Sequence, residues 1–559
     1  MKKYSIEKNV QILIAILKAH HIKNVVISPG TTNINFVVSL INDGYFKLYS
    51  AIDERGAGYI ALGLATSTGQ PAVITCTGAT ASRNYYSSLT EAYHRKIPVI
   101  AVTASQDFNK SGNLATQYIE RDKHPSDLVK MSVQVPIVRS DADLYQATIK
   151  LNRAILECYK DGGGPIHIDL ASNFSDTFVD ADLSSTRIMR RYYVYDELPR
   201  IKAKRVGIII GAHKIMSPIL SNAIDRFCKI YNGVVLVDHS SHYYGKYRVL
   251  PTILTSQRLC KIKNLEMDLL IHIGEEHADY FTNGWIQGKA KETWRISEDG
   301  EIRDTFSNLT NTFKMREIDF FSYYIKNKDS KISNNEYFKY LKKEVNSFYS
   351  LIPELPFSNV WMAKQVSQVF PHNYLLELGL SNTMRSYTFF EFKNNPVIWA
   401  NTGCRGIDGV IPTLLGFSLA NPNTPCYGIM GDLAFFYSLN ILANHNINKN
   451  LRILLINNGC GVEFNLALHR AYKIFAGDSN KINEFIAAGG HNGNKSKTLV
   501  RDYAKNLGFE YLSAHNKKEF LSNLKKFLDS SINKPIIFEA FTDIENERKA
   551  VELITGITK

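Results

Sequence analysis

Two polar segments, each at the end of a short apolar run, could together bind a metal ion. Gly431-Asp432-Leu433 follows the run 427–430, and Asn457-Asn458 follows the run 453–456. Because the carboxyl ends of parallel strands meet at one edge of a sheet, we expect Asp432 and Asn458 to lie close together. A carboxylate, an amide oxygen and a backbone carbonyl, which we assign to Cys460, are the hard oxygen ligands that Mg²⁺ prefers. A turn Asp and a loop-closing Asn pair would give the same pattern.

A segment near the N-terminus adds a second carboxylate. Asp53-Glu54-Arg55-Gly56-Ala57, together with the 26-residue spacing from Asp432 to Asn458, resembles the two halves of the site in thiamine diphosphate-dependent enzymes. The segments 69–73 and 78–84 resemble the pyrimidine-binding domain of that superfamily. The resemblance implies thiamine diphosphate and Mg²⁺ as cofactors. It also implies that Glu54 hydrogen-bonds N1′ of the aminopyrimidine ring, which allows the exocyclic nitrogen to take the C2 proton. A salt-bridged Glu at a helix start is the alternative.

Within this superfamily the chain resembles the MenD family, the SEPHCHC synthases that join 2-oxoglutarate to isochorismate in menaquinone biosynthesis. The markers are Ser28-Pro29-Gly30, Asp53-Glu54-Arg55, Gly406-Ile407-Asp408-Gly409 and Gly431-Asp432-Leu433. The resemblance implies that Ile407 props the cofactor in its V shape, where a core Ile beside a turn is the alternative. Further cofactor contacts are implied for the residues Ser381, Asn382, Gly431, Asp432, Leu433 and Asn458. It also implies a homodimer or homotetramer, because Glu54 and the metal ligands of one cofactor come from different subunits.

The chain departs from that family at the residues that bind substrate. Thr31 and Thr32 stand where the family has Ser-Arg, and Gln106 and Thr402 each replace a family Arg. Each lost charge-assisted hydrogen bond would remove roughly 1.5–3 kcal/mol of binding free energy. We therefore expect an acceptor other than isochorismate.

Other polar residues match the family or could compensate for these losses. Ser381, Arg385 and Gln117 match its substrate-side residues, and Arg405 could replace the charge missing at Thr402. The alternative for either Arg is a surface or interdomain salt bridge. Glu463, where the family is apolar, is a candidate proton donor for the acceptor. A Glu that interacts with the positive end of a helix would look the same.

These residues favour a decarboxylating carboligase. The predicted enzyme removes CO₂ from a 2-oxo acid and transfers the remaining acyl-anion equivalent to a carbonyl or other acceptor. A simple 2-oxo acid decarboxylase and the SEPHCHC synthase itself are the alternatives. A noncatalytic protein that kept the fold is disfavoured, because Glu54, Asp432 and Asn458 are all present.

The elements that must position these residues follow an α/β pattern. Short β-branched runs alternate with helical stretches, which is typical of parallel sheets flanked by helices. We predict three domains: a pyrimidine-binding domain over 1–182, a Rossmann-like domain over 190–335 and a diphosphate- and Mg-binding domain over 350–559. Predicted strands are 25–28, 72–75, 99–102, 166–169, 206–210, 234–237, 269–273, 427–430 and 453–456. Predicted helices are 55–66, 82–94 and 336–349. Neither glycine turn of the central domain completes GxGxxG, so dinucleotide binding there is weakly supported.

The composition of the chain excludes several classes of function. The 559 residues are 45% hydrophobic and 21% charged, which is typical of a globular protein. The net charge of +13 is spread along the chain, so we expect no nucleic-acid partner. The seven cysteines are scattered singly, which argues against a zinc site or a disulfide framework. No apolar stretch is long enough for a membrane span and the N-terminus lacks signal-peptide features, so we expect a cytoplasmic protein.

Overall fold

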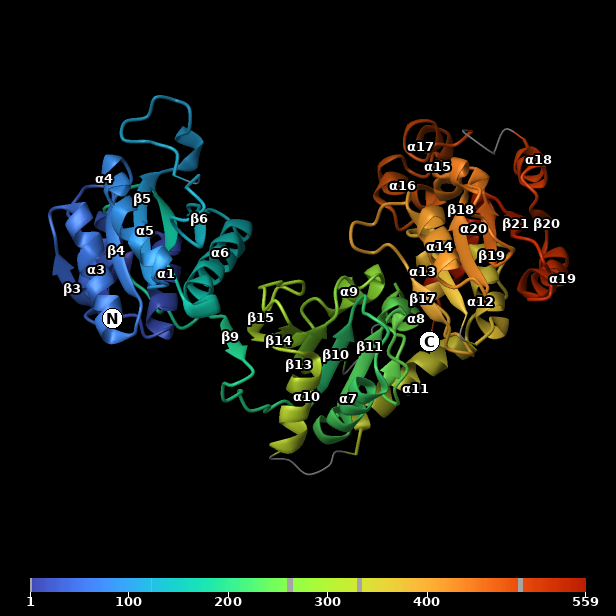
Figure 1. Ribbon diagram of the computed structural model, residues 1–559, viewed down its shortest axis with the longest axis horizontal. Coiled ribbons are helices and arrows are strands. Elements are labelled where there is room, and N and C mark those ends of the chain that lie inside the picture. The colour runs from blue at the N-terminus through green and yellow to red at the C-terminus, as the bar shows by residue number, and fades with distance from the viewer. Residues whose placement is uncertain are drawn as a thin grey trace. The chain divides into compact units, whose positions relative to one another are not determined.

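The computed structural model describes residues 3–121, 123–258, 265–328, 334–372, 374–490 and 496–558, and Cys260 lies outside them. The chain forms two compact units, Met1–Arg191 and Tyr192–Lys559. The first contains one large sheet and the second contains two, with helices on both faces (Figure 1). This confirms the predicted α/β fold class. The division into three domains stays a prediction.

The first unit is built on a sheet of order β3-β2-β4-β5-β7-β6, in which every neighbouring pair is parallel. Its strands are β2 (Asn24–Ile27), β3 (Lys47–Ser50), β4 (Ala72–Thr77), β5 (Val99–Gln106), β6 (Met131–Val135) and β7 (Ile166–Ser172). Its helices are α1 (Lys8–Ala19), α2 (Ile34–Asp43), α3 (Glu54–Thr68), α4 (Thr80–Asn84), α5 (Tyr86–His94), η1 (Phe108–Lys110), α6 (Asp141–Tyr159) and η2 (Lys160–Gly162). An antiparallel pair, β1 (Lys3–Ser5) and β8 (Phe178–Asp180), was not predicted.

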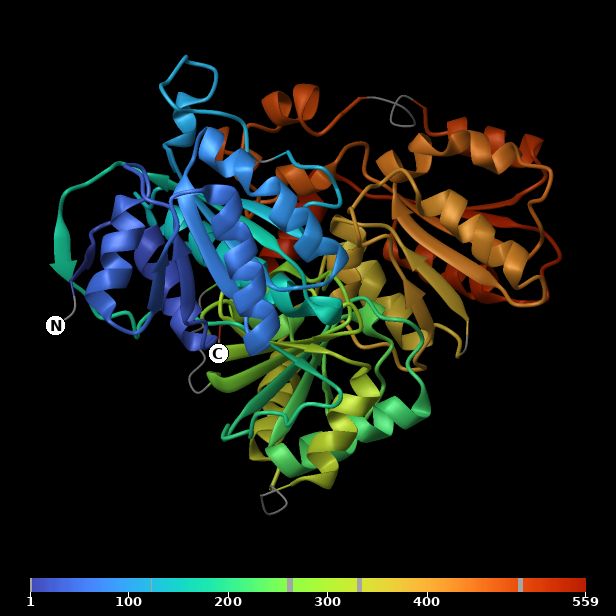
Figure 2. The same cartoon turned by 60° about the vertical axis from the view of Figure 1, so that its left-hand side comes forward.

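Helices cover both faces of this sheet (Figure 2), and the side chains on both faces are buried. Because successive strand residues point to opposite faces, Val25 packs with α1, α2 and α6, and Val26 packs with α3 and α5. Burial on both faces explains why the predicted strands appear as continuous apolar runs. The prediction of a single helix over 82–94 was wrong. The segment is two helices, α4 and α5, which meet at Tyr85.

The second unit begins with a sheet of order β12-β11-β10-β13-β14-β15-β9. Its strands are β9 (Arg190–Tyr193), β10 (Val206–Ile210), β11 (Gly233–Val237), β12 (Arg248–Val249), β13 (Met267–Ile273), β14 (Ala290–Ser297) and β15 (Leu309–Lys314). Its helices are α7 (Pro218–Tyr231), η3 (His239–Ser241), α8 (Thr252–Thr255), α9 (Tyr280–Ile286) and α10 (Glu317–Lys326). The helix α11 (Glu336–Ser350) follows.

The last sheet has the order β17-β16-β18-β19-β21-β20, again with parallel pairs. Its strands are β16 (Leu375–Leu378), β17 (Val397–Trp399), β18 (Cys426–Gly431), β19 (Leu451–Asn457), β20 (Glu510–Ala514) and β21 (Ile536–Phe541). Its helices are α12 (Asn359–Val369), α13 (Asn382–Thr388), α14 (Val410–Ala420), α15 (Asp432–Tyr437), η4 (Leu439–Ala443), η5 (Val462–Asn465), α16 (Arg470–Ile474), α17 (Ser479–Phe485), α18 (Leu499–Asn506), α19 (Lys517–Leu528) and α20 (Ile544–Thr555).

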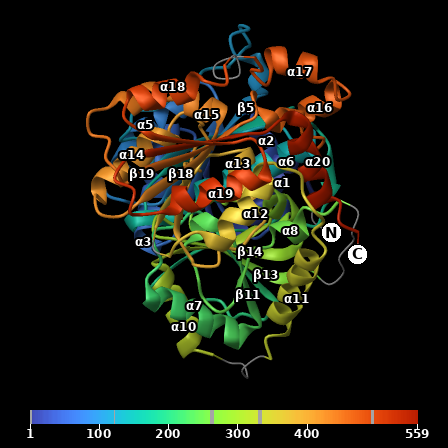
Figure 3. The same cartoon turned by 90° about the vertical axis from the view of Figure 1, so that its right-hand side faces the viewer.

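One continuous hydrophobic core joins the two sheets of the second unit. It contains residues of the central sheet such as Leu236, of α11 such as Leu341, and of the last sheet such as Leu454. Helices α12 and α19 pack on this side of the last sheet, and α14 and α15 pack on the other side (Figure 3). This shared core explains why residues 192–559 form a single compact unit. No described helix combines the length and apolar character needed to cross a membrane.

Glu377 is an unusual residue of this core. It lies on β16 beside Trp399 and Gly428 of the neighbouring strands and is fully buried. Neither of its carboxylate oxygens has a hydrogen-bond partner. Burial therefore raises the pKa of Glu377 to about 8, because the charged form loses its hydration.

This shift predicts how stability depends on pH. The folded protein holds a proton on Glu377 that the unfolded chain releases, so the free energy of unfolding should fall as pH rises from about 4.5 to 8. Glu377→Gln should remove about 2–4 kcal/mol of this fall. Urea unfolding at pH 5 and pH 8 measures it, with Glu545→Gln at an exposed position as the control. Equal pH dependence in wild type and Glu377→Gln would contradict the assignment.

Candidate active site

The loops after β18 and β19 lie together, as the sequence predicted. The two strands are neighbours and parallel, with Gly431 opposite Ile456. Asp432 is almost fully buried. Its Oδ1 accepts a hydrogen bond from Leu433 N at 2.7 Å, and its Oδ2 accepts one from Gly459 N at 2.6 Å. The carboxylate of one loop is thus tied to the backbone of the other.

The two Asn side chains at the end of β19 have different hydrogen-bond partners. Asn457 is buried, and its amide donates to Glu539 Oε1 at 2.7 Å. Asn458 is half-buried, and its Oδ1 accepts a hydrogen bond from Cys460 N at 3.4 Å. The Cys460 carbonyl accepts one from Val462 N at 2.8 Å, which leaves it a second lone pair. Asn457 is therefore engaged with Glu539, and Asn458 stays the predicted amide ligand of the metal.

This set of oxygen atoms fits a hard divalent cation. Burial raises the pKa of Asp432 to about 6, and no described Lys or Arg forms an ion pair with it. A cation bound there would offset that penalty and favour the carboxylate. Among the described residues, no group of three His, Cys, Asp or Glu side chains could hold a metal. The donors on offer are the oxygens of Asp432, Asn458 and Cys460, which suit Mg²⁺.

The loop after β16 lies beside this pair, because β16 is the neighbour of β18. Ser381 has φ 61° and ψ −121°, a conformation that is unusual outside glycine and is found at functional sites. The next residue, Asn382, begins α13 and donates to Glu547 Oε2 at 3.4 Å. Glu547 is fully buried, and its Oε1 accepts from Asn359 N at 2.8 Å. Burial raises the pKa of Glu547 to about 7. No local pattern in the sequence indicated this support from the C-terminal helix.

The loop after β17 carries three more predicted residues. Thr402 is buried, and Arg405 is half-buried with φ 55°. Ile407 is partly buried and packs against the core on the α14 side of the sheet. Ser438 Oγ donates to the carbonyl of Asp408 at 2.6 Å, which ties this loop to the segment after Asp432. The four loops of this sheet that carry candidate residues therefore lie at one edge.

Both candidate substrate-binding arginines have carboxylate partners. Arg385 pairs with Glu463, which lies in the first turn of η5. Burial would raise the pKa of Glu463, but the charge and hydrogen bond of Arg385 outweigh it and hold that pKa below its usual range. Arg405 pairs with Glu276 at 2.6 Å, and its guanidinium lies 4.1 Å from the centre of the Tyr280 ring. A salt bridge, which the sequence left open as the alternative role for Arg405, is therefore present within the second unit.

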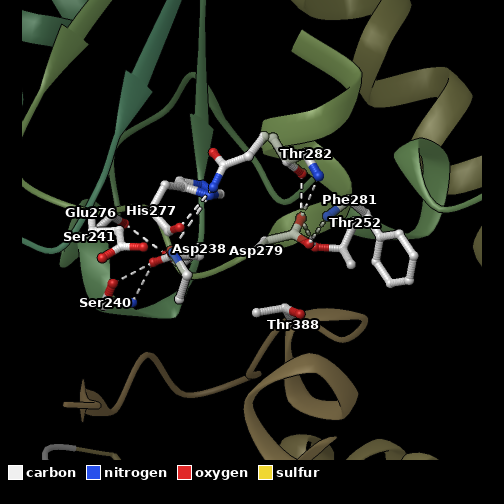
Figure 4. A network of polar contacts seen from close by, with 12 residues as sticks. Asp238, Ser240, Ser241, Thr252, Glu276, His277, Asp279, Phe281, Thr282 and Thr388 are labelled. Atoms are coloured by element: carbon white, nitrogen blue, oxygen red, sulfur yellow. Dashed lines mark hydrogen bonds and ion pairs between the residues drawn. The ribbon is translucent and has the colours of Figure 1, made fainter. Parts of the chain in front are cut away.

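Two buried aspartates hold the segment that carries Glu276 and Tyr280 (Figure 4). Asp238 accepts hydrogen bonds from Ser240 N at 2.8 Å and Ala278 N at 2.5 Å. Asp279 caps α9 by accepting from Phe281 N and Thr282 N, and it also accepts from the Thr252 hydroxyl at 2.8 Å. These contacts fix the segment before any substrate binds.

The predicted residues of the first unit also lie at the carboxyl edge of their sheet. Asp53 caps α3 through Arg55 N and Gly56 N, which places Glu54 in the first turn. Glu54 is half-buried, and its Oε2 accepts a hydrogen bond from Asn84 Nδ2 at 2.9 Å. Asn84 ends α4, which follows β4. Glu54 is thus oriented by the neighbouring loop.

The remaining substrate-side candidates differ in exposure. Thr32 is buried and donates to the carbonyl of Ala104 at 2.8 Å. Gln106, at the end of β5, donates to the carbonyl of Thr116 at 2.7 Å. Thr31 and Gln117 are exposed. Their role in substrate binding stays a prediction.

A buried ion pair that the sequence analysis missed supports the loop after β4. Arg121 and Asp169 are each 1% exposed, and Arg121 Nε lies 3.1 Å from Asp169 Oδ1. Arg121 also donates to the carbonyl of Gly78. A Cβ at Gly78 would lie 2.5 Å from the carbonyl oxygen of Ala104, so this loop accepts only glycine there. The strand pattern indicated Asp169 as a strand residue, but no local signal indicated Arg121.

Comparison with known proteins agrees with the resemblance. Residues 8–126 match the family described as thiamine pyrophosphate enzyme, N-terminal TPP binding domain. The chain is 28% identical to the 2-succinyl-5-enolpyruvyl-6-hydroxy-3-cyclohexene-1-carboxylate synthase of Bacteroides thetaiotaomicron, with 98% of each chain covered. Synthases of the same name from Phocaeicola vulgatus and Flavobacterium johnsoniae are 27% and 28% identical, with 97% and 95% of each chain covered. The similarity to these synthases extends over nearly the whole chain.

The buried ion pair yields a prediction about stability. Arg121→Met leaves Asp169 buried without its partner, which should lower the free energy of unfolding by about 3–5 kcal/mol. Arg95→Met breaks an exposed pair with Glu91 and should change it by about 0.5 kcal/mol or less. Urea unfolding of both variants measures the difference. A small effect of Arg121→Met would show that the pair does not support the loop.

Proposed function

We propose that this thiamine diphosphate-dependent enzyme, a transferase, is a carboligase that decarboxylates a 2-oxo acid and joins the remaining fragment to an acceptor. The bond between C1 and C2 of the 2-oxo acid breaks and CO₂ leaves. A new carbon–carbon bond then forms to the acceptor, whose carbonyl oxygen takes a proton. No oxidant or reductant is needed. The single observation that carries the proposal is the shared carboxyl edge of Ser381, Asp432 and Asn458, in a chain that also has Glu54.

We further propose how these residues hold the cofactor. When bound, thiamine diphosphate supplies the nucleophilic carbon of the reaction. Asp432, Asn458 and the carbonyl of Cys460 would hold Mg²⁺ against the diphosphate. Ile407 would support the cofactor between its rings. Glu54 would hold a proton at the pyrimidine ring, and Asn84, which donates to it at 2.9 Å, would keep its carboxylate oriented.

We propose that the acceptor is not isochorismate. The product that names the relatives carries acid groups on its succinyl, enolpyruvyl and carboxylate parts, and a protein that binds it has to balance their charge. Here Thr32, Gln106 and Thr402 carry no charge. Arg385 and Arg405 already have carboxylate partners. This charge balance supports an acceptor with fewer acid groups, such as an aldehyde, a ketone or a sugar.

The SEPHCHC synthase itself is the second candidate. The similarity over nearly the whole chain favours it, and it would require Glu463 and Glu276 to give up their arginines to substrate. The two candidates share the cofactor and the decarboxylation of a 2-oxo acid, and they differ in the acceptor that is joined.

A panel of substrates tests the function. Purified protein with thiamine diphosphate and Mg²⁺ is supplied with pyruvate, hydroxypyruvate, 2-oxobutanoate or 2-oxoglutarate, and CO₂ release is measured with and without acceptors. The acceptors include an aldehyde, a keto sugar and isochorismate. We expect release together with a product that requires an acceptor other than isochorismate. A product formed only with isochorismate would establish the second candidate, and release without any joined product would indicate a simple decarboxylase.

We also propose a homodimer or homotetramer in which the two halves of each site come from different subunits. Glu54 belongs to the first unit and Asp432 to the second. Ile52, Tyr59 and Ile60, near Glu54 in sequence, are 88%, 46% and 45% exposed. Exposed apolar side chains of this kind are typical of interfaces.

Complementation between variants tests this assembly. Glu54→Gln should abolish turnover while cofactor binding, followed by calorimetry, changes little. Asp432→Ala should abolish both. Because a mixed dimer contains one site with both wild-type residues, an equal mixture co-expressed in one cell should recover up to about a quarter of wild-type activity. Recovery of none, with mixed dimers confirmed by mass, would place both residues of each site on one subunit.

A further inference from the structure

The helix α20 contacts two of the segments that carry candidate site residues. In its first turn, Glu547 accepts hydrogen bonds from the starts of α12 and α13. The next residue, Arg548, donates to the carbonyl of Asn465 at the end of η5 at 3.1 Å. Farther along the helix, Val551 and Ile554 are buried in the core that joins the two sheets of the second unit. The beginning of a firmly packed helix thus reaches the candidate site.

Glu547 joins the starts of two helices through one buried carboxylate. It is fully buried, and no described Lys or Arg forms an ion pair with it. Its Oε1 accepts from N of Asn359, the first residue of α12, at 2.8 Å, and its Oε2 accepts from Nδ2 of Asn382, the first residue of α13, at 3.4 Å. Asn359 Nδ2 also donates to Thr383 Oγ1 at 3.3 Å. Because a buried carboxylate needs such donors, these residues hold one another in place.

The contact with Glu547 decides which end of the Asn382 amide faces the carboxylate. Asn382 is 8% exposed, and its Oδ1 is buried without a hydrogen-bond partner. An ionised carboxylate only accepts hydrogen bonds, so Glu547 selects the orientation in which Nδ2 faces it. The Oδ1 atom then stays available to a ligand or a water molecule, which an unsatisfied buried oxygen requires.

The residue before Asn382 has an unusual backbone conformation that needs support from both sides. Ser381 has φ 61° and ψ −121°, which costs free energy and persists only where the surrounding contacts impose it. On one side, Gly379 N donates to the carbonyl of Ile429 at 2.8 Å. On the other side, Glu547 holds Asn382. The segment 379–382 is therefore fixed at both ends.

We propose that Glu547 is a positioning residue for the cofactor, because it holds Ser381 and Asn382 in the conformation that binds thiamine diphosphate before the cofactor arrives. The inference rests on the proposed function, in which the loop after β16 lies at the cofactor, and adds a residue that does not touch the cofactor. If this loop adopted the binding conformation only about a tenth of the time, the apparent Kd would rise about tenfold. Glu547 therefore acts on the affinity for the cofactor and not on the reaction.

The variant Glu547→Gln tests the proposal. Gln keeps the size of the side chain but has one oxygen, so one of the two donors loses its acceptor. At pH 8, above the pKa of about 7 to which burial raises Glu547, the Kd of thiamine diphosphate with saturating Mg²⁺ is measured by calorimetry. We expect the Kd to rise about tenfold or more. The kcat for the donor that wild type decarboxylates fastest should change little at saturating cofactor, because bound cofactor then holds the loop. Loss of kcat with an unchanged Kd would overturn the proposal.

A second measurement does not depend on activity. Without cofactor, hydrogen exchange followed by mass spectrometry should be faster in peptides over 379–388 of Glu547→Gln than in wild type, and should be unchanged in peptides from β11. Saturating thiamine diphosphate and Mg²⁺ should remove most of the difference. Faster exchange throughout the second unit would overturn the proposal, because Glu547 would then support only general stability.

Two further variants serve as a control and as a milder test. Asp225, on α7, accepts from Tyr243 Oη at 2.5 Å and from Lys246 N at 3.0 Å, so Asp225→Asn removes a comparable acceptor and should leave the Kd unchanged. Thr383→Val removes only the hydroxyl that accepts from Asn359 and should raise the Kd about threefold. If Glu547→Gln does not fold, an unchanged Kd in Thr383→Val overturns the proposal.

Failure of the proposed function would look different. If wild type binds thiamine diphosphate but releases CO₂ from no 2-oxo acid, the carboligase proposal fails, while the Kd and the hydrogen exchange still decide the role of Glu547. If wild type releases CO₂ and Glu547→Gln binds the cofactor with the wild-type Kd, the carboligase proposal stands and only the role of Glu547 is lost.

Discussion

The contact between Asp432 and the backbone of Gly459 is the constraint on which the candidate site depends. Through Oδ2 it joins the loop after β18 to the loop after β19, while Oδ1 accepts a hydrogen bond from Leu433 N of its own segment. The contact is possible because the two strands are parallel neighbours that end at the same level. A buried carboxylate held by backbone N–H groups, with no ion pair to any basic side chain among the described residues, is suited to a cation that also binds a diphosphate.

Long-range contacts hold the loops that surround this point. Glu547, in the last helix, fixes the starts of α12 and α13 through Asn359 and Asn382. In the first unit, Arg121 and Asp169 support the loop at Gly78. The buried Asp238 acts in the same way, because it accepts a hydrogen bond from Ala278 N and so fixes the segment that carries Tyr280. Each loop is thus oriented by a buried polar group from a distant part of the chain, which limits the motion of side chains that would contact cofactor or substrate.

Charge balance separates this chain from the synthases that it resembles. Three positions where the resemblance implies Arg are uncharged here, and the two remaining candidates are paired with Glu463 and Glu276. The relatives share nearly the whole length of the chain, whereas the predicted differences are confined to charges at residues expected to face the substrate. Function therefore has to be argued from the site and not from the overall similarity.

The sequence by itself determined the fold class, most of the predicted strands, and the proximity of Asp432 and Asn458. It could do so because strand runs, helix starts and the order of a parallel sheet depend on local patterns. Only the tertiary structure decided that Asn457 donates to Glu539, that Arg121 supports Gly78, and that Arg385 and Arg405 are already paired. Those contacts join residues that are far apart in the chain. Their free energy comes from burial and charge, which no local pattern records.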